Sequence, residues 1–319
     1  MKRVLSGIQP SGELHLGNYL GAIRQWVPLQ DQYECFFTLA DLHALTSLTE
    51  PSDLQRFLHE QVVTYLSCGL DPDKAVIFKQ SDVPHHAELM WILATVTPMG
   101  LLERAHAYKD KVAKGIGSTV GLFAYPVLQA ADILLYSADL VPVGKDQKQH
   151  IEIARDIADK FHTRYGQVFT VPEPMIPEEV AVIPGIDGQK MSKSYNNAIP
   201  LFASDEQLKK LVMSIITDSA GVADKKEPVG TPLYEIFKLI NPEKAEQAAQ
   251  MLRAGGYGYG DAKKELLSAL QDFLSPLRAK RVEVEKKKGY VEEVLQDGAR
   301  SAKAESGKIM DRVRKLVGL

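Results

Sequence analysis

Residues 4–29 read VLSGIQPSGELHLGNYLGAIRQWVPL, and this stretch decides the fold. Residues 4–8 form a short apolar run that a Gln-Pro-Ser-Gly tetrapeptide closes, which is typical of a buried strand entering a turn. Apolar side chains then recur at helical spacing over 17–29. The sequence therefore predicts a strand, a turn and a helix.

Short apolar runs and helical stretches alternate in the next part of the chain. Residues 35–39 and 75–79 are further apolar runs, and a helical stretch at 52–68 separates them. Alternating strands and helices pack as a parallel sheet between helices, so we expect an α/β fold with a Rossmann-like, doubly wound parallel sheet. Further predictions are helices at 85–115 and 126–138, a strand at 140–143, a helix from about 147 and a Pro- and Gly-rich loop at 168–188.

Strand signals end near residue 203, and helical periodicity continues to the last residues. We therefore expect a Rossmann-like domain over 1–202 and an all-helical C-terminal domain over 203–319. The helices predicted in the second domain cover 205–216, 232–240, 242–254, 261–288 and 290–317.

The composition is that of an ordinary folded protein, because 45% of the 319 residues are hydrophobic and 25% are charged. Cys35 and Cys68 lack Cys-x-x-Cys spacing, so neither a zinc site nor a disulfide framework is predicted. No apolar stretch approaches the ~20 residues of a membrane span, and the N-terminus has no long apolar segment of a signal peptide. We expect a cytoplasmic protein without a membrane partner.

The tetrapeptide His15-Leu16-Gly17-Asn18 lies where the predicted turn meets the helix. Gly17 permits close backbone approach to a ligand, and the start of a helix offers N–H groups to phosphate oxygens. His15 and Asn18 can donate further hydrogen bonds, so the turn suits a triphosphate. The alternative is a plain helix start with a turn glycine.

A second motif, Lys-Met-Ser-Lys-Ser at 190–194, follows the Pro-Gly-Ile-Asp-Gly segment at 184–188. Two lysines on a mobile loop can neutralise phosphate charge as pyrophosphate leaves, although a solvated basic loop is the alternative for this motif alone. The ordered pair of motifs resembles the class I aminoacyl-tRNA synthetases, whose signatures are His-Ile-Gly-His and Lys-Met-Ser-Lys-Ser. Asn18 replaces the final His, as in the tryptophanyl branch of that family.

The middle of the chain narrows the resemblance. Residues 121–126 (GLFAYP), 129–134 (QAADIL) and 141–147 (VPVGKDQ) resemble the bacterial tryptophanyl-tRNA synthetases, and the likeness extends over nearly the whole chain. It implies ATP- and Mg²⁺-dependent activation of L-tryptophan to tryptophanyl-adenylate, followed by transfer to the 3′-terminal adenosine of tRNA(Trp).

A buried indole needs an apolar slot and one acceptor for its ring N–H, because an unpaired N–H is costly to bury. Asp132, an acid among apolar neighbours, fits that acceptor. The alternative is a helix-face acid without a ligand.

The resemblance also implies roles for individual residues, and it implies no set of protein side chains that binds a metal. Catalytic roles fall to His15, Asn18, Lys111, Lys190 and Lys193. ATP contacts fall to Gln9, Pro10, Ser11, Gly17, Asn18, Gly144, Lys145, Asp146, Ile183, Lys190, Met191, Ser192, Lys193 and Ser194. Tryptophan contacts fall to His43, Tyr125, Asp132, Val141, Val143 and Gln147, with core packing as the alternative for His43 and Tyr125.

Departures from the commonest bacterial pattern indicate a divergent branch. Leu5 and Gln129 stand where Phe and Met are usual, which leaves the tightness of the tryptophan pocket open. His85 and His86 with Glu88 could suggest a metal site, but adjacent helical residues point in different directions. We predict a solvated first turn of a helix there instead.

Basic side chains near the end of the chain are candidates for contact with tRNA phosphates, and a solvated helix face is an equal alternative. These side chains are Arg278, Lys280, Arg281 and the lysines at 286–288. The resemblance implies that 203–319 bind the tRNA anticodon arm and that an insertion at about 100–160 forms a homodimer. No DNA partner is expected.

Three rival functions stay open at this point. Tyrosine could be the substrate, because the tyrosyl enzymes share the fold, but their Tyr and Asp pair for the phenol is not found in its usual motifs. A small-molecule nucleotidyltransferase could share the first turn but has no need of a long helical domain. A non-catalytic paralogue is disfavoured by the intact Lys190, Lys193 and Asp132.

Overall fold

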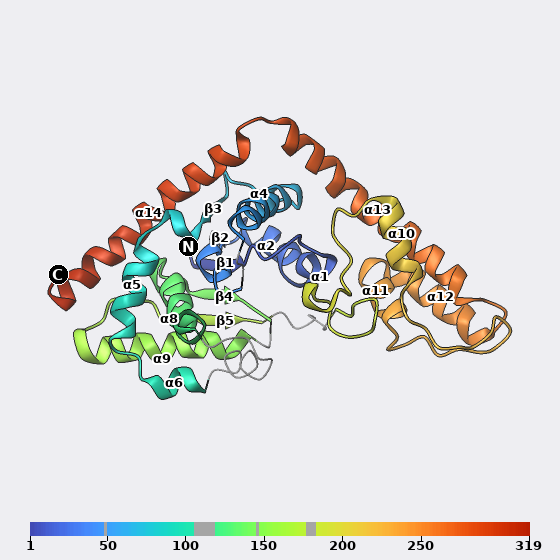
Figure 1. Cartoon of the computed structure of the whole chain (residues 1–319), viewed down its shortest axis with the longest axis horizontal. Coiled ribbons are helices and arrows are strands. Elements are labelled where there is room, and N and C mark those ends of the chain that lie inside the picture. Colours follow the sequence, from blue (N-terminus) through green and yellow to red (C-terminus); the bar gives the residue numbers. More distant parts are fainter. Residues whose placement is uncertain (48–49, 105–118, 145–146, 177–182) are drawn as a thin grey trace. The chain divides into compact units, whose positions relative to one another are not determined.

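The computed structural model describes the chain except for residues 48–49, 105–118, 145–146 and 177–182, and it contains two compact units (Figure 1). The sheet unit comprises residues 1–11, 26–178 and 287–319. The helical unit comprises residues 12–25 and 179–286.

The sheet unit is built on five parallel strands. In chain order they are β1 (Arg3–Ile8), β2 (Glu34–Leu39), β3 (Ala75–Lys79), β4 (Leu140–Pro142) and β5 (Glu173–Met175). Their spatial order is β3-β2-β1-β4-β5, so the chain winds outward from β1 first in one direction and then in the other. This order confirms the predicted Rossmann-like sheet and places its switch point between β1 and β4.

The central strands are apolar on both faces, which explains why they appear in the sequence as continuous apolar runs. Val4 and Leu5 of β1 are buried, and so are Phe36 and Phe37 of β2. Val4 pairs with Cys35 on one side and with Leu140 on the other. The strands predicted at 4–8, 35–39, 75–79 and 140–143 are therefore confirmed, whereas the loop predicted over 168–188 is wrong at β5.

The helices of the sheet unit pack on this sheet and on one another. They include α3 (Asp41–Ala44), α4 (Pro51–Ser67), α5 (His85–Ala94), α6 (Met99–Glu103), α8 (Val120–Leu135), α9 (Lys148–Tyr165) and α14 (Tyr290–Val317). α5 packs against α8, and α8 packs against α9. No helix in the described parts of the chain is long and apolar enough to cross a membrane.

Two predicted helix boundaries in this region are wrong. The helix predicted over 85–115 ends at Ala94, and α6 begins after Pro98, which cannot continue a regular helix; residues 105–115 of that prediction lie outside the described residues. The helix predicted to begin at 126 begins at Val120, because the hydroxyl of Thr119 accepts the backbone N–H of Leu122 and caps the helix six residues earlier.

Helix α14 packs across β3, which is the last strand at one edge of the sheet (Figure 1). The contact is so close that a Cβ on Gly298 would lie 1.8 Å from the carbonyl oxygen of Ile77. An ion pair of 2.6 Å between Arg314 and Glu88 joins α14 to α5. The compact units therefore divide the chain at other points than the sequence boundary at residue 202, because α14 packs on the sheet.

The helical unit begins with α1 (Leu16–Asn18) and a π-helical turn at Tyr19–Ile23. Helix α2 (Arg24–Leu29) begins in this unit and continues into the sheet unit. Its other helices are α10 (Asp205–Met213), α11 (Pro232–Ile240), α12 (Pro242–Ala254) and α13 (Tyr259–Lys286). The side chains of Ser204, Thr231 and Asn241 cap α10, α11 and α12. The predicted helices are confirmed, with small differences at their ends.

Candidate active site

Asp132 of α8 is the centre of a buried polar cluster in the sheet unit, and only 4% of its surface is exposed. One carboxylate oxygen, Oδ1, accepts hydrogen bonds from His86 Nδ1 at 2.6 Å and from Gln80 Nε2 at 2.7 Å. The other oxygen, Oδ2, accepts from His43 Nε2 at 2.8 Å. Asp132 and His43, each predicted to contact tryptophan, are therefore in direct contact with one another.

These three hydrogen bonds determine the chemical state of Asp132. Burial alone would raise the pKa of this carboxyl group, but the hydrogen bonds from His43 and His86 outweigh burial and hold its pKa well below the usual range. An ionised carboxylate offers about four lone-pair sites, of which the three donors occupy three. Once the contacts of the described residues are counted, one acceptor site on Oδ2 therefore remains for a further donor such as an N–H group of a ligand.

His86 corrects a prediction made from the sequence. It was expected in a solvated first helical turn, yet it has no exposed surface and its second nitrogen, Nε2, lies 2.8 Å from the hydroxyl of Tyr136. The sequence carried a signal for this burial, since His86, Leu89 and Leu93 share one face of α5 at spacings of three and four residues. Gln80 gave no such signal, because it lies in the short turn Gln80–Asp82 after β3.

Several candidate residues follow the carboxyl ends of the parallel strands. Gln9, Pro10 and Ser11 follow β1, His43 lies in α3 just after β2, and Gln80 follows β3. Val141 is buried within β4, and Val143 and Gly144 come directly after that strand. In open parallel sheets, ligands bind beyond the carboxyl ends of the strands at the switch point, and these residues surround that region.

Tyr125 and Gln147 complete the candidate tryptophan residues in the sheet unit. The hydroxyl of Tyr125 lies 2.8 Å from Nε2 of His150, and burial raises the pKa of Tyr125 to about 12, so the hydroxyl stays protonated. Gln147 is the residue that precedes α9. Lys145, Asp146 and Lys111 lie outside the described residues.

The His-Leu-Gly-Asn motif belongs to the helical unit, where it begins α1. The backbone N–H of His15 donates to the side-chain oxygen of Asn18 at 3.1 Å, which leaves the amide nitrogen of Asn18 as a donor. Nδ1 of His15 is buried without a hydrogen-bond partner in the described residues. Burial and the nearby charge of Lys193 lower the pKa of His15 to about 4, so its imidazole is neutral at pH 7.

The Lys-Met-Ser-Lys-Ser segment contacts this motif within the helical unit. Sδ of Met191 accepts the backbone N–H of Gly17 at 3.3 Å, and Nζ of Lys193 donates to the carbonyl oxygen of Gly12 at 2.8 Å. Burial lowers the pKa of Lys193 to about 8, whereas Lys190 is exposed. The structure thus brings together the two motifs that lie some 170 residues apart in the sequence.

Asn197, which no motif or periodicity marks in the sequence, organises this segment. Its side-chain oxygen accepts the N–H of Ser192 at 2.8 Å, and its side-chain nitrogen donates to Oδ1 of Asp187 at 2.7 Å and to the carbonyl oxygen of Lys190 at 3.1 Å. Only 1% of its surface is exposed. A Cβ on Gly185 would lie 2.4 Å from the Asn197 side chain, so a glycine is required where the loop passes over it.

Ile183 lies beside the same segment, and Ser192 and Ser194 belong to it. Ile183 is buried, and its carbonyl oxygen accepts the N–H of Met191 at 2.8 Å. Its side chain approaches Gly21 in the π-helical turn, at 4.0 Å from where a Cβ on that glycine would lie. The hydroxyl of Ser192 accepts the N–H of Ser194, so both serines take part in the turn itself.

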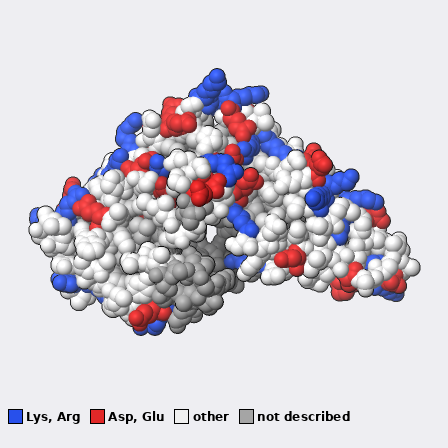
Figure 2. Space-filling model, in the orientation of Figure 1, with Lys and Arg blue, Asp and Glu red and all other residues white. Residues whose placement is uncertain are grey.

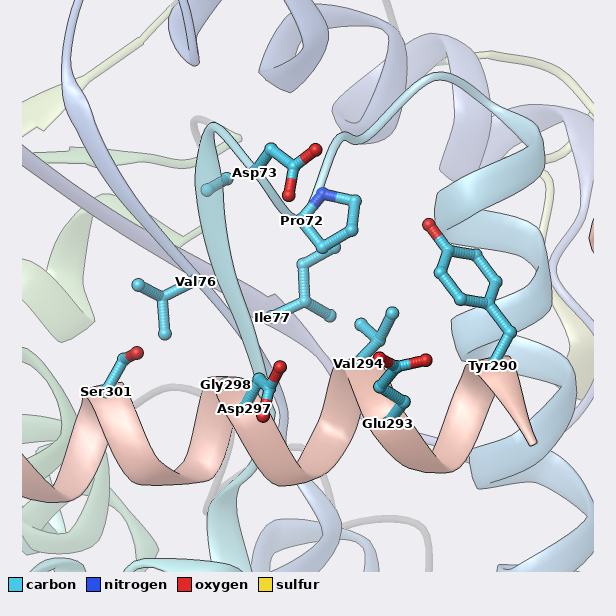
Figure 3. Close-up of a pocket in the computed structure, with 11 residues that line it drawn as sticks. Pro72, Asp73, Val76, Ile77, Tyr290, Glu293, Val294, Asp297, Gly298 and Ser301 are labelled. Atoms are coloured by element: carbon cyan, nitrogen blue, oxygen red, sulfur yellow. The ribbon is translucent and has the colours of Figure 1, made fainter.

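A separate pocket of about 230 Å³ lies where α14 crosses the start of β3 (Figure 3). Asp73 precedes the strand, and Tyr290, Glu293 and Asp297 line the pocket from α14. None of the candidate site residues lines it. In the described parts of the chain, no three His, Cys, Asp or Glu side chains are grouped in a way that could hold a metal ion.

The chain matches known proteins in sequence and in fold. The family model described as tRNA synthetases class I (W and Y) matches residues 1–275. A tryptophan–tRNA ligase from Fusobacterium nucleatum is 51% identical over 100% of this chain and 98% of its own, and one from Rhodopirellula baltica is 48% identical over 99% of both. The crystal structure of tryptophanyl-tRNA synthetase from Campylobacter jejuni complexed with ADP and tryptophan has a TM-score of 0.92 at 46% identity, over 99% of this chain and 100% of that one.

Proposed function

Because the chain belongs to the class I tRNA synthetases for tryptophan and tyrosine, we propose that it is a tryptophan–tRNA ligase. It activates L-tryptophan with ATP to tryptophanyl-adenylate and transfers the amino acid to the 3′-terminal adenosine of tRNA(Trp). The observation that carries the choice of tryptophan is the acceptor site that the described residues leave on the buried carboxylate of Asp132.

That site suits an indole better than a phenol. The indole N–H is a donor only, so one carboxylate lone pair satisfies it completely. A phenol hydroxyl also carries acceptor lone pairs, which a carboxylate cannot satisfy, and leaving them buried without a donor is unfavourable. In the proposed complex, Val141 and Val143 contact the ring, and Tyr125 and Gln147 face the ammonium group.

The first chemical step is an in-line displacement that needs positioning and charge neutralisation. A carboxylate oxygen of tryptophan attacks the α-phosphorus of ATP, the bond to the bridging oxygen breaks, and pyrophosphate leaves with that electron pair. Lys190 and Lys193 would stabilise the charge on pyrophosphate, and the neutral His15 would donate a hydrogen bond to a phosphate oxygen. In the second step a ribose hydroxyl of the tRNA attacks the carbonyl carbon, and AMP leaves.

The present contacts of the two motifs are of the kind that a phosphate can replace. Sulfur is a weak acceptor for the Gly17 N–H, and Lys193 donates to a neutral backbone carbonyl. A phosphate oxygen makes a stronger, charge-assisted hydrogen bond with either donor. Binding of ATP would therefore exchange both contacts for phosphate contacts.

Mg²⁺ belongs to the proposal as a companion of the triphosphate. This ion usually keeps several water ligands and binds through substrate phosphates with only one or two protein carboxylates. Its chemical contribution there is to neutralise phosphate charge.

For tRNA, the exposed lysines at 286–288 are better candidates than the other basic residues. Arg278 pairs with Asp205 at 2.6 Å, and Lys280 and Arg281 pair with acids one helical turn further along α13. The three lysines lie at the turn between α13 and α14, where Figure 2 shows Lys and Arg side chains gathered on the surface. The anticodon-binding role of 203–319, the homodimer formed by about 100–160 and the cytoplasmic location stay predictions.

ATP–pyrophosphate exchange tests the proposal directly. We expect exchange that depends on tryptophan and that tyrosine does not support. Asp132→Ala should weaken the use of tryptophan far more than the use of ATP. Equal exchange with both amino acids would refute the choice of tryptophan, and no exchange with either would point to a non-catalytic paralogue.

A further inference from the structure

We infer that His86 is a positioning residue for tryptophan recognition: held by the Tyr136 hydroxyl, it fixes the Asp132 carboxylate so that one lone pair of Oδ2 faces the substrate. The inference rests on the proposed function and goes beyond it, because His86 and Tyr136 belong to neither motif. It concerns residues of the sheet unit only.

The hydrogen-bond partners of His86 determine where its proton lies. A carboxylate can only accept, so Nδ1 of His86 carries the hydrogen in the 2.6 Å bond to Asp132 Oδ1. In a neutral imidazole the other nitrogen, Nε2, is then an acceptor, and it lies 2.8 Å from the Tyr136 hydroxyl. Burial and the charge of Asp132 raise the pKa of Tyr136 well above its usual value, so this hydroxyl stays protonated and can donate.

Aromatic packing holds the rings of His86 and Tyr136 in place. Tyr136 stacks on Phe36 with ring centroids 4.9 Å apart and lies 5.3 Å from Phe78. His86 stacks on Phe78 at 6.0 Å. Because Phe36 and Phe78 belong to β2 and β3, the imidazole is fixed against the sheet and cannot rotate without disturbing the core.

The two oxygens of the Asp132 carboxylate are hydrogen-bonded unequally, which explains why the position of His86 affects the substrate. Oδ1 receives two donors, His86 and Gln80, while Oδ2 receives only His43. Removing the His86 donor leaves one bond on each oxygen, so the carboxylate loses the difference that determines which oxygen keeps a free lone pair. The indole N–H would then meet an acceptor of less defined direction, and tryptophan would bind more weakly.

Two amide variants separate the two hydrogen bonds of His86. In His86→Asn the amide nitrogen takes approximately the place of Nδ1 and keeps the donor to Asp132. In His86→Gln the side-chain end takes approximately the place of Nε2 and keeps only the contact with Tyr136. Both variants are polar, and both remove the imidazole ring from the same buried site, so each is the control for the other.

The assay is ATP–pyrophosphate exchange with tryptophan and ATP varied in turn, together with calorimetric binding of tryptophan alone. We expect His86→Gln to raise the KM and Kd for tryptophan at least tenfold, with kcat and the KM for ATP within twofold of wild type. His86→Asn should stay within threefold in every constant. Thermal melting of both variants accompanies the kinetics.

Equal tryptophan KM values for His86→Gln and wild type would overturn the inference. Equal losses in both variants would also overturn it, since they would show a purely structural role for the ring. The wild-type protein in the same assay tests the proposed function separately: if it shows no tryptophan-dependent exchange, the proposed function fails, and if it does, a wild-type KM in His86→Gln refutes only the role of His86.

Discussion

Replacing Asn197 by Ala should release the Lys-Met-Ser-Lys-Ser segment without unfolding the helical unit. The buried Asn197 side chain makes three hydrogen bonds, to Ser192, Asp187 and Lys190, and all three stay within that segment and the turn before it. Alanine removes all three and leaves the Ser192 N–H without its acceptor. The segment then loses the contacts that define its conformation.

The expected magnitude follows from these contacts. Each of the two bonds to backbone groups contributes about 1 kcal/mol, and the bond to the charged Asp187 contributes about 2 kcal/mol. Water can replace part of this at a half-buried loop, so we expect the local opening free energy to fall by about 3 kcal/mol. At about 1.4 kcal/mol per factor of ten, the open population rises roughly 100-fold.

Limited proteolysis with trypsin measures the opening, because trypsin cleaves after Lys190 and Lys193. Cleavage at these bonds should become up to about 100-fold faster in Asn197→Ala, and kcat/KM for ATP should fall at least tenfold. Tyr195→Phe is the control, since Tyr195 is 49% exposed in the same turn and should behave as wild type. A cleavage rate and an ATP dependence unchanged in Asn197→Ala would refute the reasoning.

Three further predictions concern stability and pH. Gly298→Val should destabilise the sheet unit by about 3 kcal/mol in urea unfolding, because its Cβ would collide with the Ile77 carbonyl. Gly307→Ala is the control on the same helix: the nearest atom is 3.7 Å away, so this change should stabilise the unit by about 1 kcal/mol, and equal unfolding midpoints for the two variants would contradict the packing. The pKa of His15 is lowered from 6.5 to about 4, so the stability that the neutral imidazole contributes is complete above pH 6.5 and is lost as pH falls toward 4. The free energy of unfolding of His15→Asn should therefore rise relative to that of wild type over this pH window. Parallel curves of unfolding free energy against pH for the two proteins would argue against it. Because the pKa of Lys193 is lowered to about 8, kcat/KM for ATP should fall as pH rises through 8. Lys193→Arg should remove that fall. The same pH profile in wild type and Lys193→Arg would exclude Lys193 as the source of the fall.

The strands of the sheet could be predicted where burial is two-sided. β1, β2 and β3 are buried over most of their length, and their apolar residues appear in the sequence as short runs. β5 could not be predicted in this way, because its three residues are Glu, Pro and Met. A proline fits there because β5 is an edge strand, where a missing N–H costs little, but edge position is not visible in the sequence.

The candidate site likewise contains residues that could be predicted from the sequence and residues that could not. Asp132 could be chosen from the sequence because an acid among Ala and Ile side chains requires a buried partner. Its partners could not all be chosen, since Gln80 and His86 come from separate elements that only the tertiary structure brings to it. Asn197 was missed for a related reason, because a loop residue with a structural role carries no periodicity.

Helix α14 was predicted correctly as a helix, but its amphipathic pattern could not reveal what it covers. Periodicity shows that one face is buried and gives no information about the partner. Here the partner is β3, more than 200 residues earlier in the chain. A long helix at the end of a helical region therefore proved to be part of the packing of the sheet.

That contact has a consequence for synthesis on the ribosome. A chain emerges from its N-terminus, so β3 is made long before α14, and until then the unpaired edge of the sheet is open to other polypeptides. Of the described elements, the one that closes this edge is also the last to be made. Nascent chains of this protein should therefore depend on chaperone protection for most of their synthesis, and translation that stops before residue 290 should yield fragments that aggregate through β3.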